Sequence, residues 1–99
     1  MQRHGVLIDE VRLAEWARRH EVKRLALFGS FLRDDFGPES DLDVLIEFLP
    51  GARVSLLDLI GMELELTEML GHKVDLRTPQ DLSRYFRDQV ATAEECYAA

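Results

Sequence analysis

Two aspartates separated by one residue carry the clearest chemical signal in the sequence. Asp41 and Asp43 lie at the start of a segment, Leu42–Phe48, whose residues alternate in a two-residue rhythm typical of a β-strand. Side chains two apart on a strand leave the same face, and their α-carbons are roughly 6.5–7 Å apart. Carboxylates that converge in this way are ligands of the type that Mg²⁺ prefers. We therefore expect a site for hard divalent cations here.

A glycine–serine pair precedes the aspartates, at the end of another predicted strand. Gly29 allows the backbone to approach a ligand closely, and the helix expected at residues 31–35 starts with free N–H donors. Ser30 is the expected N-cap of that helix, and its hydroxyl adds a donor. Arg33, one turn further on, adds a positive charge. These features favour a phosphate-binding turn at Gly29 and Ser30.

A third carboxylate, Asp75, lies in a short strand predicted at residues 73–77. Its neighbours Val74 and Leu76 are apolar, so they should face the covered side of a sheet and Asp75 the opposite side. If this strand lies next to Leu42–Phe48, Asp75 joins Asp41 and Asp43 as a third metal ligand. Each feature alone is common, but their combination on three successive strands is specific.

The elements that must position these residues alternate between helices and strands. The pattern predicts helices at 8–20, at 31–35, between Ser55 and Gly71, and at 79–90, with strands at 23–28, 42–48 and 73–77. We expect an α+β fold with a three-stranded mixed sheet and helices packed mainly on one face. The tail, residues 91–99, is expected to be frayed unless it docks.

The long predicted helix carries more apolar surface than one contact requires. Its apolar residues cover roughly 240° of the circumference, whereas packing on one sheet face needs about 100–140°. The excess indicates either a second contact, with a partner subunit or another helix of the chain, or a helix sandwiched within its own domain. Glu63 lies inside the apolar arc, and the sequence does not explain it.

Length and composition limit the possible functions. The 99 residues, 46% hydrophobic and 31% charged, suit one folded domain over residues 1–99. A net charge of −7 counts against a passive nucleic-acid binder and against binding to an anionic membrane surface. The single cysteine, Cys96, permits neither an internal disulfide nor a thiolate metal site. We expect a cytoplasmic protein.

The chemical motifs together resemble those of a known superfamily. Gly29-Ser30, ten intervening residues and Asp41-x-Asp43 are similar to the signature of the polymerase-β-type nucleotidyltransferases. The fuller strings GPESDLDVLIEF and GHKVDLRTP resemble its minimal members, which are commonly antitoxins paired with HEPN-type ribonuclease toxins. The resemblance runs from about residue 23 to residue 79.

The resemblance implies a reaction and a role for each residue. Gly29, Ser30 and Arg33 would bind the nucleotide triphosphate, and Asp41, Asp43 and Asp75 would bind two Mg²⁺ ions. AMP would pass from ATP to a hydroxyl, by resemblance a tyrosine of the toxin, and block the ribonuclease. The expected assembly is a hetero-oligomer with that toxin.

The sequence departs from the family pattern and leaves two rival functions open. Phe31 and Leu32 replace small or polar residues, and Asp34 and Asp35 add negative charge that could weaken triphosphate binding. One rival is an antitoxin that neutralises by binding alone. The other is nucleotidyl transfer to tRNA or to a small molecule, which the acidic composition and the lack of a second, helical domain disfavour.

Overall fold

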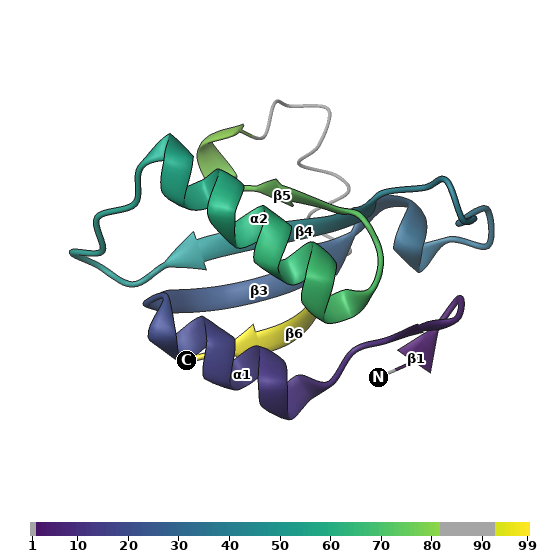
Figure 1. Cartoon of the computed structure of the whole chain (residues 1–99), viewed down its shortest axis with the longest axis horizontal. Helices are drawn as coiled ribbons and strands as arrows, with labels where there is room; N and C mark the ends of the chain where they lie inside the picture. The colour runs from purple at the N-terminus through teal and green to yellow at the C-terminus, as the bar shows by residue number, and fades with distance from the viewer. Residues whose placement is uncertain (1, 82–92) are drawn as a thin grey trace.

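The chain folds around a four-stranded mixed sheet, seen in the computed structural model, which describes residues 2–81 and 93–99. The strands are β3 (Val22–Phe28), β4 (Leu42–Phe48), β5 (Val74–Arg77) and β6 (Glu94–Ala98). Their order is β5-β4-β3-β6, with β4 and β5 parallel and the other pairs antiparallel (Figure 1). A separate ribbon pairs β1 (Gln2–Arg3) with β2 (Val6–Leu7).

The sheet has four strands, one more than the sequence predicted. β3, β4 and β5 are confirmed, but the segment Glu94–Ala98, expected to be a frayed tail, forms β6 along the free edge of β3. The local sequence Glu-Glu-Cys-Tyr-Ala shows no alternation that indicates a strand. The segment is extended because β3 offers an unpaired row of backbone donors and acceptors, which only the tertiary structure reveals.

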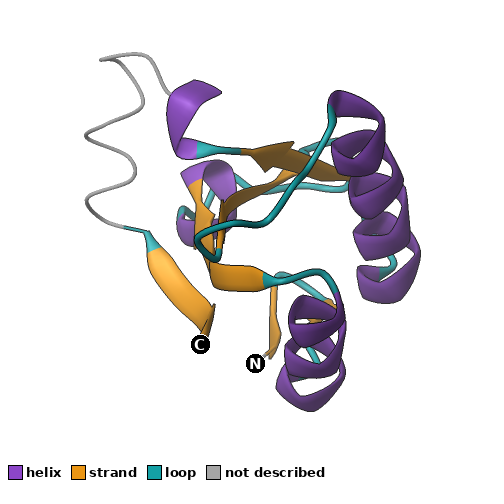
Figure 2. Cartoon of the chain, turned by 90° about the vertical axis from the view of Figure 1, so that its left-hand side faces the viewer, coloured by secondary structure: helices purple, strands orange, loops and turns teal. Residues whose placement is uncertain are grey.

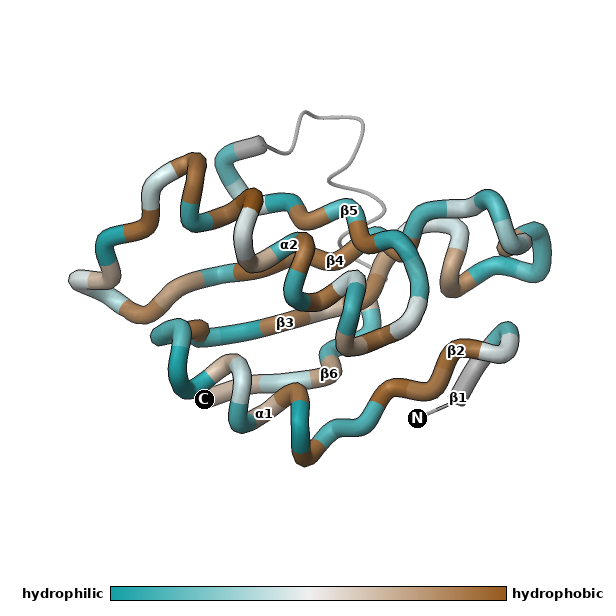
Figure 3. The backbone as a smooth tube through the Cα atoms, in the orientation of Figure 1, coloured by the Kyte–Doolittle hydropathy of each residue, from teal (hydrophilic) through white to brown (hydrophobic). Residues whose placement is uncertain are grey.

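Both long helices cover the same face of the sheet, as predicted. Figure 2 shows α1 (Glu10–Arg19) and α2 (Leu56–Leu70) together on one side of the strands. Apolar residues are concentrated along β3 and β4 in Figure 3, and a single main cluster joins both strands to the helices. Its members from β4 are Leu42, Val44 and Ile46. The residues between them must therefore face the other side of the sheet.

The helix boundaries follow capping chemistry. The Asp9 carboxylate accepts hydrogen bonds from the first turn of α1, and α1 lies within the predicted range 8–20. Ser55 and Asp58 form a capping box at the start of α2, and Gly71 ends it with a φ of 65°. The predicted ends of α2 are thus confirmed. Of the helix predicted at 79–90, residues 79–81 form a 3₁₀ turn, η2 (Pro79–Asp81), and residues 82–90 lie outside the described residues.

Glu63, whose place in the apolar arc the sequence does not explain, accepts a hydrogen bond from the backbone of the edge strand β5 and so connects β5 to α2. The Leu76 N–H donates to the Glu63 carboxylate at 2.8 Å, and the Val74 N–H donates to the Thr67 hydroxyl at 3.1 Å. β5 is an edge strand, so these N–H groups have no strand partner on that side. Two polar side chains of α2 therefore take the place of a further strand and hold β5 in position.

None of the helices in the described ranges 2–81 and 93–99 has the length and apolar character required to cross a bilayer.

Candidate active site

The strand register brings the end of β3, the start of β4 and β5 into one row. Phe28 pairs with Asp43, and Asp43 pairs with Asp75 on the parallel neighbour. Paired residues on adjacent strands lie about 4.7–4.9 Å apart and point to the same face. Because Leu42 and Val44 face the helices, Asp43 and Asp75 leave the opposite face, where both remain partly exposed beside the buried cluster of Ala26, Phe28 and Leu45. The adjacency of β4 and β5 that the sequence analysis required is therefore present.

Gly29 lies in contact with the central carboxylate of this row. It directly follows β3 and has a φ of 71°, a conformation that favours glycine. A Cβ atom at this position would overlap Asp43 Oδ2, so the Asp43 side chain would have to move. The absence of a side chain at Gly29 therefore lets the turn after β3 pack directly against the Asp43 carboxylate.

The turn itself differs from the predicted helix at 31–35. Residues Gly29–Leu32 form a short 3₁₀ helix, η1, and no side chain caps it, so the prediction that Ser30 is an N-cap was wrong. The helix begins earlier because Gly29 adopts its positive φ directly after the strand. Ser30 is consequently inside η1, half-buried, rather than preceding it.

The electrostatic environment of Asp43 is unfavourable to a negative charge. Burial, followed by the nearby charges of Asp75 and Asp41, raises the pKa of Asp43 to about 6 from its ordinary 3.8. The positive charges of Arg77 and Arg33 oppose this rise but do not cancel it. No ion pair joins Asp43 to another residue in the described part of the chain. Within the described ranges, Asp43 is thus the one carboxylate of the three without a basic ion-pair partner.

The two outer carboxylates are paired with basic residues that the sequence analysis did not single out. Arg77 donates two hydrogen bonds, each 3.1 Å long, to the two oxygens of Asp75. The Lys73 ammonium lies 3.9 Å from Asp41. Lys73, Asp75 and Arg77 are two apart along the strand segment, so strand periodicity would have placed all three on one face.

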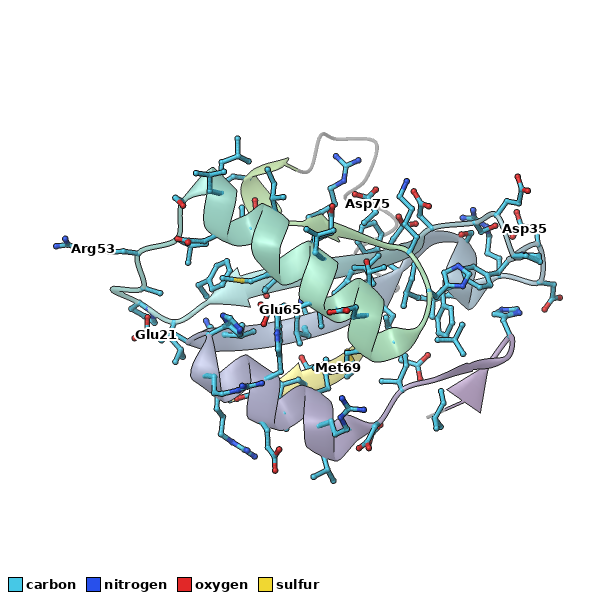
Figure 4. All side chains as sticks on the ribbon, in the orientation of Figure 1. Glu21, Asp35, Arg53, Glu65, Met69 and Asp75 are labelled. Atoms are coloured by element: carbon cyan, nitrogen blue, oxygen red, sulfur yellow. The ribbon has the colours of Figure 1, made fainter. Side chains whose placement is uncertain are left out.

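Arg33 does not reach the carboxylate row directly. Its Nε lies 3.2 Å from an Asp35 oxygen, on the exposed loop between η1 and β4. Figure 4 shows Asp35 on this loop, well separated from Asp75 over β5. Arg33 contributes a long-range charge to Asp43, while its guanidinium pairs with one of the two aspartates that interrupt the family pattern.

Mg²⁺ suits these residues by donor type, although their side chains are not gathered around one point. Among the described residues, no three His, Cys, Asp or Glu side chains are grouped closely enough to hold a metal ion. Asp41, Asp43 and Asp75 supply hard oxygen ligands, and the crowding of negative charge at Asp43 favours a cation. The side chains of Asp41 and Asp75 would have to turn from Lys73 and Arg77 for all three to face one ion.

Comparisons with known proteins agree with this geometry. A family model described as "Nucleotidyltransferase domain" matches residues 12–98. A protein of Methanocaldococcus jannaschii named "putative protein adenylyltransferase" is 40% identical over 72 residues, 73% of this chain and 75% of that protein. The protein adenylyltransferase MntA of Thermococcus cleftensis is 38% identical over 64 residues, 63% of this chain and 61% of that protein.

Solved structures share the same fold. One described as a "putative minimal nucleotidyltransferase" is 32% identical with a TM-score of 0.67, covering 87% of this chain and 85% of that one. A "toxin-antitoxin with AMP-PNP" has a TM-score of 0.73 at 19% identity, covering 93% and 75%. A tri-AMPylated Shewanella oneidensis HEPN toxin in complex with MNT antitoxin gives a TM-score of 0.64 at 18% identity, covering 91% and 70%.

Proposed function

The chain belongs to the nucleotidyltransferase domain family and is a nucleotidyltransferase, as its motifs predicted, and we propose that it transfers AMP from ATP to a tyrosine hydroxyl of a HEPN-type ribonuclease toxin. The transfer would make it the antitoxin of that toxin. The observation that carries the proposal is the row of Gly29, Asp43 and Asp75 across three strands, with a central carboxylate that forms no ion pair with any described residue.

The chain's own groups have distinct tasks in this reaction. The backbone N–H groups at Gly29 and Ser30, with the Ser30 hydroxyl, bind the β- and γ-phosphates of ATP. Arg33, which is exposed, adds positive charge when its guanidinium moves from Asp35 to the triphosphate. Asp41, Asp43 and Asp75 hold Mg²⁺, and Arg77 keeps the Asp75 carboxylate oriented until then.

Mg²⁺, when bound, supplies the positive charge that favours a deprotonated acceptor hydroxyl and stabilises the departing pyrophosphate. Because the pKa of Asp43 is raised to about 6, protonation of this carboxylate competes with cation binding at and below about pH 6. In the transfer, the acceptor oxygen bonds to the α-phosphorus and the bond from the α-phosphorus to the bridging oxygen breaks. The acceptor proton leaves to solvent, and pyrophosphate is the second product.

The acceptor class is supported by the relatives. Several are named protein adenylyltransferases, and one fold neighbour is an MNT antitoxin in complex with an AMPylated HEPN toxin. Both long helices, α1 and α2, lie on the other side of the sheet from Asp43 (Figure 2). A cytoplasmic location belongs to the same proposal, because a lone cysteine suits a reducing compartment.

The test is label transfer from ATP to a HEPN-type ribonuclease toxin, taken from a gene beside that of this chain where one is found. ATP labelled at the α-phosphate should label a tyrosine of that protein in the presence of Mg²⁺, and ATP labelled at the γ-phosphate should not. The double variant Asp41→Asn/Asp43→Asn should lose transfer by at least about 10³-fold, because the metal charge is lost. Glu47→Gln, which changes a carboxylate on the same face of β4, is the matched control and should retain transfer.

Three results would contradict the proposal. Undiminished transfer by the double variant would remove the metal role of the two aspartates. Label appearing on tRNA or a small molecule, and not on the toxin, would assign a different acceptor. Full neutralisation of the toxin by the double variant would indicate an antitoxin that acts by binding alone.

A further inference from the structure

The outward face of α2 carries an apolar stripe that the fold does not cover. Leu56, Leu57, Ile60 and Leu64 are 74%, 79%, 48% and 64% exposed, whereas Met62, Leu66 and Leu70 on the other side of the helix are buried. With 3.6 residues per turn, Leu57, Ile60 and Leu64 fall on one side of the helix. The second contact predicted from the apolar arc is therefore not made within the described residues.

A glycine, Gly61, lies beside this stripe, and no contact within the described part of the chain requires a residue without a side chain there. Gly61 is one turn from Leu57 and Leu64, and a Cβ atom at its position would meet nothing within 4 Å. Glycine in a helix interior costs about 1 kcal/mol relative to alanine. Gly61 and Leu57 also line a surface hollow of about 390 Å³, whose other lining residues are mostly charged, among them Arg19, Asp58 and Glu65. The position is thus open to a side chain that comes from outside the chain.

The apolar stripe of α2 and the carboxylate row lie on opposite sides of the sheet, so an acceptor protein at the carboxylates does not reach the stripe. Asp43 and Asp75 open on the face of the sheet opposite α1 and α2, so an acceptor hydroxyl must approach from that side. A protein docked over the carboxylates would have to wrap around the sheet to reach the outer face of α2. This step rests on the proposed function, and it requires a different occupant for the stripe.

The stripe is complementary to itself when two copies of α2 run antiparallel. About a two-fold axis between Ile60 and Gly61, Leu57 faces Leu64 of the other copy, and Ile60 faces Gly61, which has no side chain. The same arrangement brings the loop before α2, which carries Arg53, to the last turns of the other copy, which carry Glu68, and both residues are exposed. Figure 4 shows the Arg53 side chain extending away from the molecule, and Arg53 has no ion-pair partner within the described ranges.

We propose that this α2 stripe (Arg53, Leu57, Ile60, Gly61, Leu64 and Glu68) binds a second copy of the chain through antiparallel α2 helices. In such an isologous contact each pair occurs twice, so one complementary pair contributes two interactions. Antiparallel helices with a glycine at the crossing approach closely and bury the facing leucines. The resulting dimer presents its two carboxylate sites outward, away from the contact.

The test is the association state of the full chain by sedimentation equilibrium, without ATP or toxin. The wild-type chain should dimerise, and Leu57→Glu/Leu64→Glu should raise the dimer Kd by at least about tenfold. Arg53→Glu alone and Glu68→Arg alone should each raise the Kd by about threefold or more, because each faces like charges twice. The double variant Arg53→Glu/Glu68→Arg should restore the wild-type Kd, which a merely weakened surface would not do.

Several outcomes would overturn the dimer. A chain that stays monomeric over a wide concentration range, or a double charge reversal that fails to restore association, contradicts the antiparallel contact. Binding of the HEPN-type protein that is lost in Leu57→Glu/Leu64→Glu would assign the stripe to the toxin instead. Circular dichroism and nucleotidyl transfer should stay unchanged in these variants, so failure of the dimer and failure of the proposed activity are read separately.

Discussion

Two groups of acidic side chains lie at opposite ends of the same face of the sheet, and the chain neutralises them differently. At the C-terminal end of β4, Arg24 lies between Glu47 and Glu95, at 3.2 Å and 2.7 Å from their carboxylates. At the N-terminal end, roughly 13 Å away, Arg77 and Lys73 pair with Asp75 and Asp41. The central Asp43 has no such partner among the described residues.

The difference shows what marks a functional carboxylate in this fold. At one end of the face, a single arginine, Arg24, forms ion pairs with two acidic strand residues, Glu47 and Glu95. The hydrogen bond to Glu95 raises the pKa of Arg24. Around Asp43 the chain instead crowds three carboxylates and a side-chain-free glycine, and the pKa of Asp43 rises to about 6. Retained charge repulsion at carboxylates that are partly exposed favours an external cation.

The largest effect is expected from filling the contact between the turn and Asp43. Gly29→Ala puts a Cβ where Asp43 Oδ2 lies, so nucleotidyl transfer should fall by at least about 100-fold, with stability lowered by about 2 kcal/mol. Gly51→Ala is the matched control, because its φ is also positive, 87°, but its Cβ would meet nothing within 4 Å. Equal losses in both variants, by transfer assay and thermal unfolding, would show that only backbone strain matters.

The next largest effect is expected in how the stability of the chain depends on pH, which reports the charge repulsion at Asp43. A carboxylate whose pKa is higher in the folded than in the unfolded state destabilises the fold increasingly as pH rises from about 4 to about 6. Asp43→Asn should therefore stabilise the metal-free chain by about 1–2 kcal/mol at pH 8, allowing for solvent screening, and by nothing at pH 3. Urea unfolding at both pH values measures this.

Glu47→Gln, at the neutralised end, serves as the control for the pH measurement. It should not stabilise the chain at pH 8, because the Glu47 carboxylate is already paired with Arg24. A gain at pH 8 from Glu47→Gln as large as that from Asp43→Asn would remove the contrast between the two ends.

A smaller effect is expected from the support of β5. Glu63→Ala removes the acceptor of the Leu76 N–H and should cost about 1 kcal/mol of stability, while Glu63→Gln keeps an acceptor and should cost less than half of that. Because the bond holds β5 beside β4, Glu63→Ala should also raise the Mg²⁺ concentration needed for half-maximal transfer. If Glu63→Ala loses stability without that rise, the contact is structural and does not position Asp75.

The smallest effect should come from removing the shared cation at the neutralised end. Arg24→Gln leaves Glu47 and Glu95 facing each other and should cost about 0.5–1 kcal/mol at low salt, and less at high salt, since all three side chains are partly exposed. Nucleotidyl transfer should stay within about twofold of wild type. A large loss of transfer would mean that the two ends of the face are coupled, contrary to the comparison.

Local patterns in the sequence were sufficient for the elements that carry their own signals. The alternation of residues 42–48 and the capping residues Ser55 and Gly71 are confirmed, and the adjacency of β4 and β5, on which the role of Asp75 depended, is present. The spacing of Gly29-Ser30 and Asp41-x-Asp43 identified the family. These signals are local, because strand periodicity, helix caps and turn residues act over a few neighbouring positions.

Contacts between distant segments were decided only by the tertiary structure. The sequence determined that Asp41, Asp43 and Asp75 carry negative charge on strands, whereas the register determined that Asp43 lies against Gly29 and that Arg77 and Lys73 pair with its neighbours. In the same way, β6 exists because β3 has a free edge, and Glu63 is polar because β5 has unpaired N–H groups. Hydrogen-bond satisfaction and charge pairing depend on which groups meet in space, and no local pattern records that.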